Sequence, residues 1–116
     1  FGEVKESQVH LRETSKSAGY LEFEKARVRW FLSINENDLP ETIKAKGQRT
    51  YRSITIDTEE IEFSGGFTDL HTESYKNILS GKGFGLEDAK PSIEIVHSIR
   101  NLALILKSDL KHKFIS

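Results

Sequence analysis

The sequence predicts an α+β fold, in which an open, mainly antiparallel β-sheet carries helices packed on one face. Two observations favour this class. Polar and apolar residues alternate through most of the first two-thirds of the 116-residue chain, as they do in half-buried strands. Apolar residues then recur with helical spacing through the last third. No repeat or low-complexity stretch is visible, and we expect a single domain over residues 1–116.

The first three strands follow from alternating patterns. Residues 4–14 place apolar side chains between polar neighbours, and residues 19–24 alternate apolar with acidic side chains. Residues 27–35 show strict alternation, with apolar side chains at four positions: Val28, Trp30, Leu32 and Ile34. We expect Trp30 to lie in the core, while Phe31 points to the opposite face.

Residues 35–48 interrupt the alternation with loop-forming asparagine, aspartate, proline and glycine residues. A short helix over residues 41–46 is compatible with this loop. Alternation returns in residues 50–57 and 60–64. We therefore expect two further strands, which pair through a turn at positions 58 and 59.

The first expected helix of the last third begins at Thr68. The Thr68 hydroxyl can accept a hydrogen bond from an amide of the first turn, which makes it the expected N-cap. Asp69 would then lie in the first turn, near the positive end of the helix. Gly81 is expected at the C′ position, where glycine commonly ends a helix.

A second helix is expected after the glycine-rich bridge at residues 81–85. Asp88 is its expected N-cap, which places Pro91 in the first turn, where a missing N–H is tolerated. The apolar stripe of this helix is wide, which indicates burial on more than one side. Residues 102–106 either extend this helix or form a last strand, and the sequence does not predict the structure of the tail.

An open sheet also has a second face. If Tyr20, Phe31 and Tyr51 share that face, three aromatic side chains stand there among polar neighbours. An exposed apolar patch on a sheet commonly marks an interface. We therefore expect a homo-oligomer that forms through the β-sheet face.

The charge balance excludes several classes of function. The chain has 17 basic and 18 acidic residues, a net charge of −1, and neither half is strongly basic. A duplex-DNA clamp and a polybasic membrane anchor need clustered positive charge, so no nucleic acid and no membrane is expected as a partner. No apolar run approaches a membrane span and no signal-peptide pattern is visible, which predicts a cytoplasmic protein. The lack of cysteine excludes disulfides and thiolate chemistry.

The best candidate for a binding site begins with two adjacent glycines at residues 65–66. Glycine lets the backbone approach a ligand closely, and these two precede Thr68, Asp69 and His71 at the start of an expected helix. Amides and the dipole favour an anion such as a phosphate or carboxylate there, and His71 can donate, accept or carry charge near neutral pH. A turn with a capped helix, in which His71 packs on Tyr75, explains the same residues equally well.

Other candidate residues give weaker signals. The Gly-Phe-Gly sequence at residues 83–85 lies between two expected helices, whereas a dinucleotide-binding fingerprint lies between a strand and a helix, so a connector is favoured. No two histidines have metal-ligand spacing, and no metal site is expected. Arg27, Arg29 and Arg52 could face a carboxylate or phosphate, although pairing with glutamates on a neighbouring strand is favoured.

Five segments between residues 26 and 100 resemble, as a set, the C-terminal half of UDP-N-acetyl-2-amino-2-deoxyglucuronate dehydrogenases. This family belongs to the glucose-fructose oxidoreductase (Gfo/Idh/MocA) superfamily. The segments are residues 26–34 (ARVRWFLSI), 47–54 (GQRTYRSI), 60–64 (EIEFS), 66–72 (GFTDLHT) and 83–89 (GFGLEDA).

The resemblance implies part of an enzyme that oxidises C3 of a UDP-linked N-acetylated sugar or sugar acid with NAD, in lipopolysaccharide O-antigen sugar biosynthesis. It implies that the Rossmann domain, an active-site lysine and an Asp/His motif lie outside these residues, so that the fragment itself has no catalytic residue, no NAD site and no activity. It also implies that the sheet packs against its copy in a neighbouring subunit. Thr68, Asp69 and His71 match a family motif near the sugar-nucleotide pocket, which makes them the expected substrate-binding residues.

Two departures from the family pattern stand out. The family usually ends in a tyrosine-histidine-proline segment where residues 110–113 read LKHK, and Thr58 replaces a glycine often found in that hairpin turn. The chain opens on Phe1 rather than on a methionine, which we interpret as the start of a piece of a longer oxidoreductase. The alternative is a non-catalytic α+β module that only dimerises or binds a carbohydrate.

Overall fold

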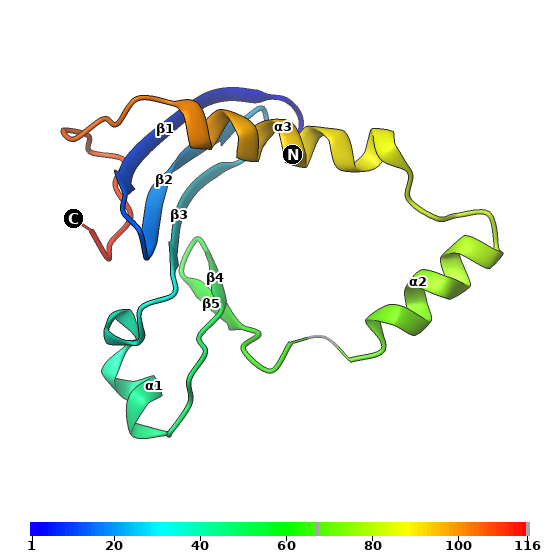
Figure 1. Cartoon of the computed structure of the whole chain (residues 1–116), viewed down its shortest axis with the longest axis horizontal. Helices are drawn as coiled ribbons and strands as arrows, with labels where there is room; N and C mark the ends of the chain where they lie inside the picture. Colours follow the sequence, from blue (N-terminus) through cyan, green and yellow to red (C-terminus); the bar gives the residue numbers. More distant parts are fainter. Residues whose placement is uncertain (67, 116) are drawn as a thin grey trace. The chain divides into compact units, whose positions relative to one another are not determined.

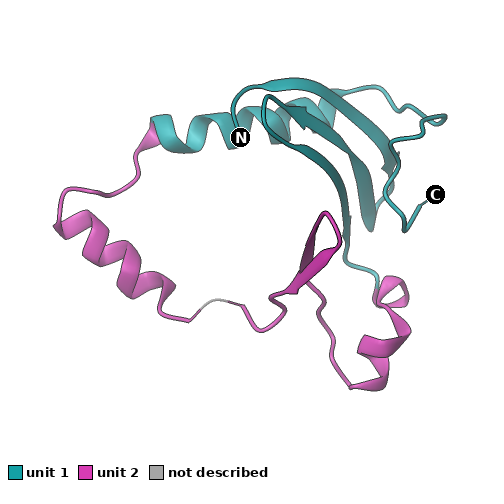
Figure 2. Cartoon of the chain, turned by 180° about the vertical axis from the view of Figure 1, so that it is seen from behind, with its two compact units in different colours: residues 1–35, 87–116 teal, residues 36–86 magenta. Residues whose placement is uncertain are grey.

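The computed structural model describes residues 1–66 and 68–115 and confirms the α+β class (Figure 1). Phe67, which belongs to one segment of the family resemblance, and Ser116 lie outside the described residues. The chain divides into two compact units (Figure 2). Unit 1 comprises residues 1–35 and 87–116, and unit 2 comprises residues 36–86. No helix in the described part of the chain is long and apolar enough to cross a membrane.

A three-stranded antiparallel sheet forms the centre of unit 1. Its strands are β1 (Val4–Arg12), β2 (Lys16–Phe23) and β3 (Arg27–Ser33), in the order β1-β2-β3. The pairing of β2 with β3 is regular, whereas the pairing of β1 with β2 changes register between Val9 and Leu11. Such an irregularity bends a strand and increases its local twist.

The core of unit 1 lies in the middle of this sheet. Its buried apolar residues are Val9, Ala18, Tyr20 and Leu21. Gly19 pairs with Trp30 of β3. A Cβ added at Gly19 would lie 2.2 Å from the Gln8 carbonyl oxygen and 2.6 Å from Cζ2 of Trp30. The indole ring therefore packs directly on the Gly19 backbone, where only glycine leaves room.

The alternating residues of β3 are less buried than the sequence predicts. Trp30 is half-buried, while Leu32 and Ile34 are 67% and 89% exposed. The alternation thus identifies the strand correctly but overstates its burial. The reason is that period two reports which face a side chain is on, whereas burial depends on what covers that face.

Helix α3 (Leu86–Asn101) is held to the sheet at its C-terminal end (Figure 1). The Arg12 Nη2 atom of β1 donates hydrogen bonds to the carbonyl oxygens of Ile99 and Leu102, each at 2.7 Å. The last carbonyls of a helix have no partner within the helix, and a cation beside them also suits the negative end of the helix dipole.

The prediction that Asp88 caps α3 is wrong, because the helix begins two residues earlier. Glu87 and Asp88 both lie in its first turn, and Pro91 lies inside the helix. Acidic side chains stabilise the positive end of a helix from within the first turn as well as from the cap. Pro91 is the sixth residue of the helix, so its missing N–H leaves the Glu87 carbonyl without its helical hydrogen bond, and its ring crowds that carbonyl.

The segment after α3 returns to the edge of the sheet. The helix stops at Asn101, and Leu104 then forms a parallel bridge with Val9. The Ile105 amide donates to the Val9 carbonyl oxygen at 2.8 Å. Of the two alternatives for residues 102–106, neither holds in full, because the helix stops at Asn101 and the segment forms an isolated bridge at Leu104 but no strand.

The remaining tail contacts one face of the three-stranded sheet. Ser108 Oγ donates to Gln8 Oε1 at 3.0 Å, and Arg29 Nε donates to the Leu110 carbonyl oxygen at 3.2 Å. The Phe31 ring stacks on the His112 ring at a centroid distance of 5.7 Å and meets the Phe114 ring edge-on at 5.4 Å.

This tail changes the picture of an exposed aromatic face. Tyr20 is 2% exposed, and Phe31, on the same face of the sheet, is covered in part by the tail of its own chain. Tyr51 belongs to unit 2 and donates a hydrogen bond to Glu60. The expected open patch of three aromatic rings is thus at least partly buried within the chain.

Unit 2 contains short helices and one hairpin. In chain order they are the 3-10 helix η1 (Glu36–Asp38), α1 (Glu41–Ala45), β4 (Ser53–Ile56), β5 (Glu59–Glu62) and α2 (Leu70–Leu79). The five strands of the described residues therefore form two sheets, β1-β2-β3 and β4-β5, and not one open sheet. Ile56 pairs with Glu59, so the turn lies at Asp57 and Thr58, one residue earlier than predicted. Asp57 has φ 55°, a left-handed conformation that aspartate tolerates.

Candidate functional site

The β4–β5 hairpin continues beyond its strands into the candidate site. The Phe63 amide donates to the Arg52 carbonyl oxygen at 2.9 Å, and the Arg52 amide donates to Ser64 Oγ at 2.9 Å. The Ser64 hydroxyl donates in turn to Glu62 Oε1 at 3.0 Å. Ser64 is only 9% exposed, so its hydroxyl acts as a fixed link between the two sides of the hairpin end.

The two glycines of the sequence-predicted site follow this link directly. The Gly66 amide donates to the Phe63 carbonyl oxygen at 3.0 Å, which closes a tight turn. Gly66 has φ 76°, a left-handed conformation that favours glycine. Arg52 lies beside this turn, because its Nη2 atom donates to the Ser64 carbonyl oxygen at 3.3 Å. A Cβ added at Gly66 would lie 4.0 Å from the same Nη2 atom.

Thr68 does not cap α2 as predicted, and Asp69 does not lie in its first turn. The helix begins at Leu70, and Asp69 is the N-cap residue, with φ 59° and no side-chain hydrogen bond to the helix. This left-handed backbone keeps Asp69 out of the helix and moves the start beyond the position that Thr68 would cap. The prediction that Gly81 follows the end of α2 is confirmed, since the helix ends at Leu79 and Gly81 has φ 75°.

The three predicted site residues are all exposed at the N-terminus of α2. The Asp69 side chain makes no capping hydrogen bond to the first amides of the helix, which have no partner within the helix. Within the described residues, no ring contact joins His71 to Tyr75, and Tyr75 is 66% exposed. The packing of His71 on Tyr75 that a purely structural role requires is therefore not seen.

The other histidines have structural surroundings in unit 1. His10 is 4% exposed and shares a hydrogen bond of 2.8 Å with Gln8. Burial lowers the pKa of His10, and Lys111 lowers it further. Burial likewise lowers the pKa of His112, with smaller contributions from Lys113 and Arg29. Nowhere in residues 1–66 and 68–115 do three potential metal ligands come together.

A hollow with a volume of about 340 Å³ lies beside α2. It is lined by one side of the helix together with the connector to α3: Leu70, Glu73, Ser74, Asn77, Ile78, Gly83 and Phe84. A Cβ added at Gly83 would lie 3.1 Å from the Ile78 side chain. The glycine therefore allows the connector to approach the helix, which supports the interpretation of residues 83–85 as a connector and not a phosphate-binding loop.

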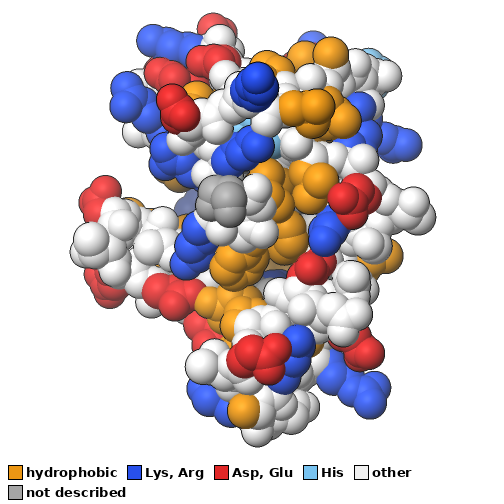
Figure 3. Space-filling view, turned by 90° about the vertical axis from the view of Figure 1, so that its left-hand side faces the viewer, with side chains coloured by type: hydrophobic (Ala, Val, Ile, Leu, Met, Phe, Trp, Pro, Cys, Tyr) orange, Lys and Arg blue, Asp and Glu red, His pale blue; other side chains and the backbone are white. Residues whose placement is uncertain are grey.

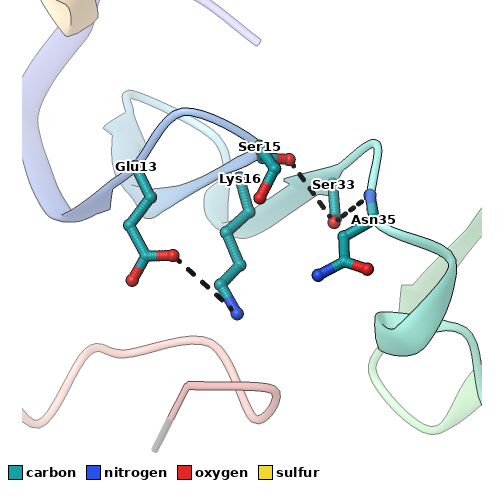
Figure 4. Close-up of polar contacts among 5 residues, drawn as sticks. All are labelled: Glu13, Ser15, Lys16, Ser33 and Asn35. Atoms are coloured by element: carbon teal, nitrogen blue, oxygen red, sulfur yellow. Dashed lines mark hydrogen bonds and ion pairs between the residues drawn. The ribbon is translucent and has the colours of Figure 1, made fainter.

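A second hollow, of about 400 Å³, lies at the β1–β2 turn of unit 1. The Ser33 hydroxyl and the charges that line the hollow are engaged within the fold (Figure 4). Ser33 Oγ donates to the Ser15 carbonyl oxygen at 3.5 Å and accepts from the Asn35 amide at 3.0 Å. Lys16 pairs with Glu13 at 3.9 Å. These contacts fasten the end of β3 to the turn and leave no unmatched charge for a ligand.

Comparison with solved structures shows that the fold corresponds to part of a dehydrogenase. No family model matches the chain. One protein of known structure to which the chain is similar is the WlbA (WbpB) dehydrogenase from Thermus thermophilus. Its crystal structure in complex with NAD and alpha-ketoglutarate is 50% identical over 98% of this chain, with a TM-score of 0.92. Its structure in complex with NAD and UDP-GlcNAcA is 49% identical over 98% of this chain, with a TM-score of 0.91.

These structures confirm the resemblance noted from the sequence. The chain spans 37% of the length of the dehydrogenase chains that it matches. It thus corresponds to one part of a larger fold, at an identity high enough that individual side chains can be compared between the two proteins.

The sequence did not single out Arg52 from the other arginines of the strands. Arg27 Nε lies 3.8 Å from Glu22 Oε1, as cross-strand pairing predicts. Arg29 contacts the tail and not a glutamate. Arg52 contacts the turn at residues 65–66. Only the hairpin pairing, which joins residue 52 to residues 63 and 64, brings this arginine to the site.

Proposed function

We propose that this chain is the substrate-binding and oligomerisation part of an NAD-dependent oxidoreductase. The parent protein would oxidise C3 of a UDP-linked N-acetylated sugar or sugar acid in lipopolysaccharide biosynthesis. The observation that carries the proposal is the identity of 49% over 98% of the chain with a dehydrogenase whose structure contains NAD and UDP-GlcNAcA. That protein is similar to this chain over only 37% of its own length, so the activity is assigned to the parent protein.

The described residues do not fit NAD. A dinucleotide site needs a glycine-rich turn between a strand and a helix. The Gly-Phe-Gly connector at residues 83–85 lies between α2 and α3, and Gly83 packs against Ile78. The proposal therefore assigns NAD to another part of the parent protein, and titration of this chain alone with NADH should show no tight binding.

We assign substrate binding to Thr68, Asp69 and His71. Their exposure, the two glycines before them and the helix start without a side-chain cap support this role. Such a start presents amides that suit an anionic group, and the hydroxyl, carboxylate and imidazole can form hydrogen bonds with a sugar.

The test uses the full-length protein that carries this segment. Wild-type protein should form NADH when supplied with NAD and UDP-GlcNAcA. Changing His71 to Ala should raise KM or lower kcat, by roughly tenfold for the loss of one hydrogen bond to a charged group. His97→Ala is the matched control, since His97 is an exposed histidine of α3. Unchanged kinetics of His71→Ala would remove His71 from the site, and binding without any NADH formation would favour a non-catalytic carbohydrate-binding module.

The parent protein is also proposed to be a cytoplasmic homo-oligomer that associates through the β-sheet face. The face of the sheet that carries Phe31 supports association, since Phe31 remains only half-buried even beneath the tail. Hydrophobic side chains also reach the surface elsewhere, among charges of both signs (Figure 3). Because the tail lies over Phe31, a second copy would contact the tail as well as the strands. Light scattering over a concentration series tests this, and a monomer at every concentration would contradict it.

A further inference from the structure

We propose that Arg52 binds an oxyanion of the substrate, either a phosphate of the nucleotide diphosphate or the carboxylate of the sugar acid. This inference rests on the proposed function and adds a specificity-determining residue to the same site. It joins an arginine of the β4–β5 hairpin to the segment that carries Thr68, Asp69 and His71.

The arginines that lie in or next to strands differ in the partners of their guanidinium groups. Arg12 is used to cap α3, and Arg27 pairs with Glu22. Arg29 donates to the Leu110 carbonyl oxygen in the tail contact. Arg52 differs from all three, because its guanidinium contacts one neutral backbone oxygen, that of Ser64. Among the described residues, no carboxylate lies within 4.0 Å of it.

Arg52 is held by both its backbone and its side chain. Its amide donates to Ser64 Oγ, and its carbonyl accepts from the Phe63 amide. The same Ser64 supplies the carbonyl oxygen that holds the guanidinium. Ser64 is nearly buried, and its hydroxyl also bonds Glu62. The backbone amide and the guanidinium of Arg52 are therefore both held by one fixed residue. A positioned fork loses little rotamer freedom when it binds an anion, which favours tight and specific recognition.

The Arg52 guanidinium lies close to the turn that precedes α2. The Nη2 atom of Arg52 is 4.0 Å from the position that a Cβ would take on Gly66. Thr68 follows Gly66 by two residues, and two residues of extended chain span at most about 7 Å. The guanidinium and the start of α2 therefore lie within the length of a diphosphate-linked sugar, so that a single ligand can reach both.

The negative charge of the proposed ligand also favours recognition by an arginine. A UDP-linked sugar acid carries negative charge on its diphosphate and on its carboxylate. The chain has a net charge of −1, and no broad basic surface is expected to attract such a ligand. Recognition must then come from individual cations, and a planar guanidinium matches the two oxygens of a phosphate or carboxylate.

A purely structural role for the Arg52 side chain predicts something different. The hairpin end is held by the backbone amide and carbonyl of residue 52, and any residue other than proline supplies both groups. Removing the guanidinium should therefore weaken ligand binding far more than it weakens the fold.

The experiment measures dissociation constants by calorimetry for three probes: UDP, UDP-GlcNAc and UDP-GlcNAcA. It uses the full-length protein as wild type, Arg52→Gln, Arg52→Lys and the control Arg49→Gln. Arg49 is also exposed and basic, precedes the same strand and makes no contact used above. We expect Arg52→Gln to weaken binding roughly tenfold to a hundredfold, as for the loss of a hydrogen bond to a charged group. Arg52→Lys should restore part of the loss, and Arg49→Gln should bind as wild type does.

The three probes separate the two oxyanions. Weaker binding of all three by Arg52→Gln would assign the contact to the diphosphate, and weaker binding of UDP-GlcNAcA alone would assign it to the carboxylate. Equal affinities of wild type and Arg52→Gln for every probe would overturn the inference while leaving the proposed function intact. An equal loss in Arg49→Gln would also overturn it, since the effect would then be one of net charge. A wild-type protein that binds none of the probes would instead refute the proposed function. Circular dichroism of each variant confirms that the fold is retained.

Discussion

Unit 1 and unit 2 differ in how much of their apolar surface each one buries by itself. Unit 1 contains four of the five buried apolar residues among the described residues, all within β1 and β2. Unit 2 contains the fifth, Ile43 of α1. Its hairpin and α2 have no buried apolar residue, and Ile54, Ile56 and Ile61 are each about half exposed or more.

This difference shows where the chain can hold its own structure and where it depends on other surfaces. A two-stranded hairpin alone is marginally stable in water, whereas three strands with a covered face can be independently stable. The candidate site lies in unit 2, at the end of that hairpin. Segments of low intrinsic stability often carry ligand-binding loops, because binding then orders them. The following changes test the contrast, beginning with the largest expected effect.

Gly19→Ala should be the most damaging single change in unit 1. The new Cβ would overlap the Gln8 carbonyl oxygen and the Trp30 ring, and neither β1 nor the indole can move away without losing the pairing. We expect a loss of about 3 kcal/mol or more of unfolding free energy. Urea denaturation followed by the fluorescence of Trp30, the single tryptophan, measures it. Gly65→Ala in unit 2 is the control, since no atom lies within 4 Å of its added Cβ, and an equal loss there would contradict the assignment.

Val9→Ala should have an intermediate effect. Val9 is completely buried, and its truncation leaves a cavity in the core of unit 1, at a cost of about 2 kcal/mol. Ile61→Ala removes a larger side chain from unit 2, but Ile61 is 49% exposed. We expect it to cost less than about 1 kcal/mol when the chain is measured by itself. Urea denaturation compares the two, and a larger loss for Ile61→Ala would mean that unit 2 has a core of its own.

Acidification should have the smallest effect, on the tail of unit 1. Burial, aided by Lys113 and Arg29, lowers the pKa of His112 below its ordinary value of 6.5. The unfolded chain therefore binds a proton first as the pH falls. The stabilising contribution is complete above about pH 6.5 and declines as the pH falls toward the lowered pKa.

The measurement is the hydrogen-exchange protection of the Ile105 amide, which bonds Val9. Protection should decrease when the pH is lowered from about 7.5 to about 5.5, the range in which histidine titrates. His112→Phe keeps a ring on Phe31 and should reduce this dependence. A residual dependence is expected from His10, whose pKa is lowered by burial and by Lys111. Protection that does not change with pH in the wild type would show that the tail is not held in this way.

Local patterns predicted most of the elements and fewer of their contacts. Alternation located all five strands, because each has at least one face that differs from the other in polarity. It could not show that β4 and β5 form a separate sheet, since pairing across the chain is not encoded in the period of either strand. The start of α2 was predicted one residue too early, after a Thr68 cap, and the start of α3 too late, after an Asp88 cap. An aspartate can precede a helix, cap it or lie in its first turn.

The candidate site was predictable in part. Two glycines before a helix identified the segment from residue 65 to residue 71, and the structure exposes Thr68, Asp69 and His71 there. The sequence contained no sign that Arg52 lies beside Gly66, because that contact depends on the register of the hairpin. The tail was equally hidden, since its contacts with Gln8, Arg29 and Phe31 join residues at opposite ends of the chain.

The contacts of Arg12 with the end of α3 have a consequence for synthesis on the ribosome. The side chain and the Leu102 carbonyl that it binds are 90 residues apart in sequence. Unit 1 therefore cannot close until nearly all of the segment between them has been translated, while the β4–β5 hairpin and α2 need only near neighbours. Loop closure over such a distance is entropically costly and slows folding. The intervening region should thus sample its local structure before unit 1 closes, and the apolar side chains of unit 1 stay open to chaperones until the segment around Leu104 reaches β1.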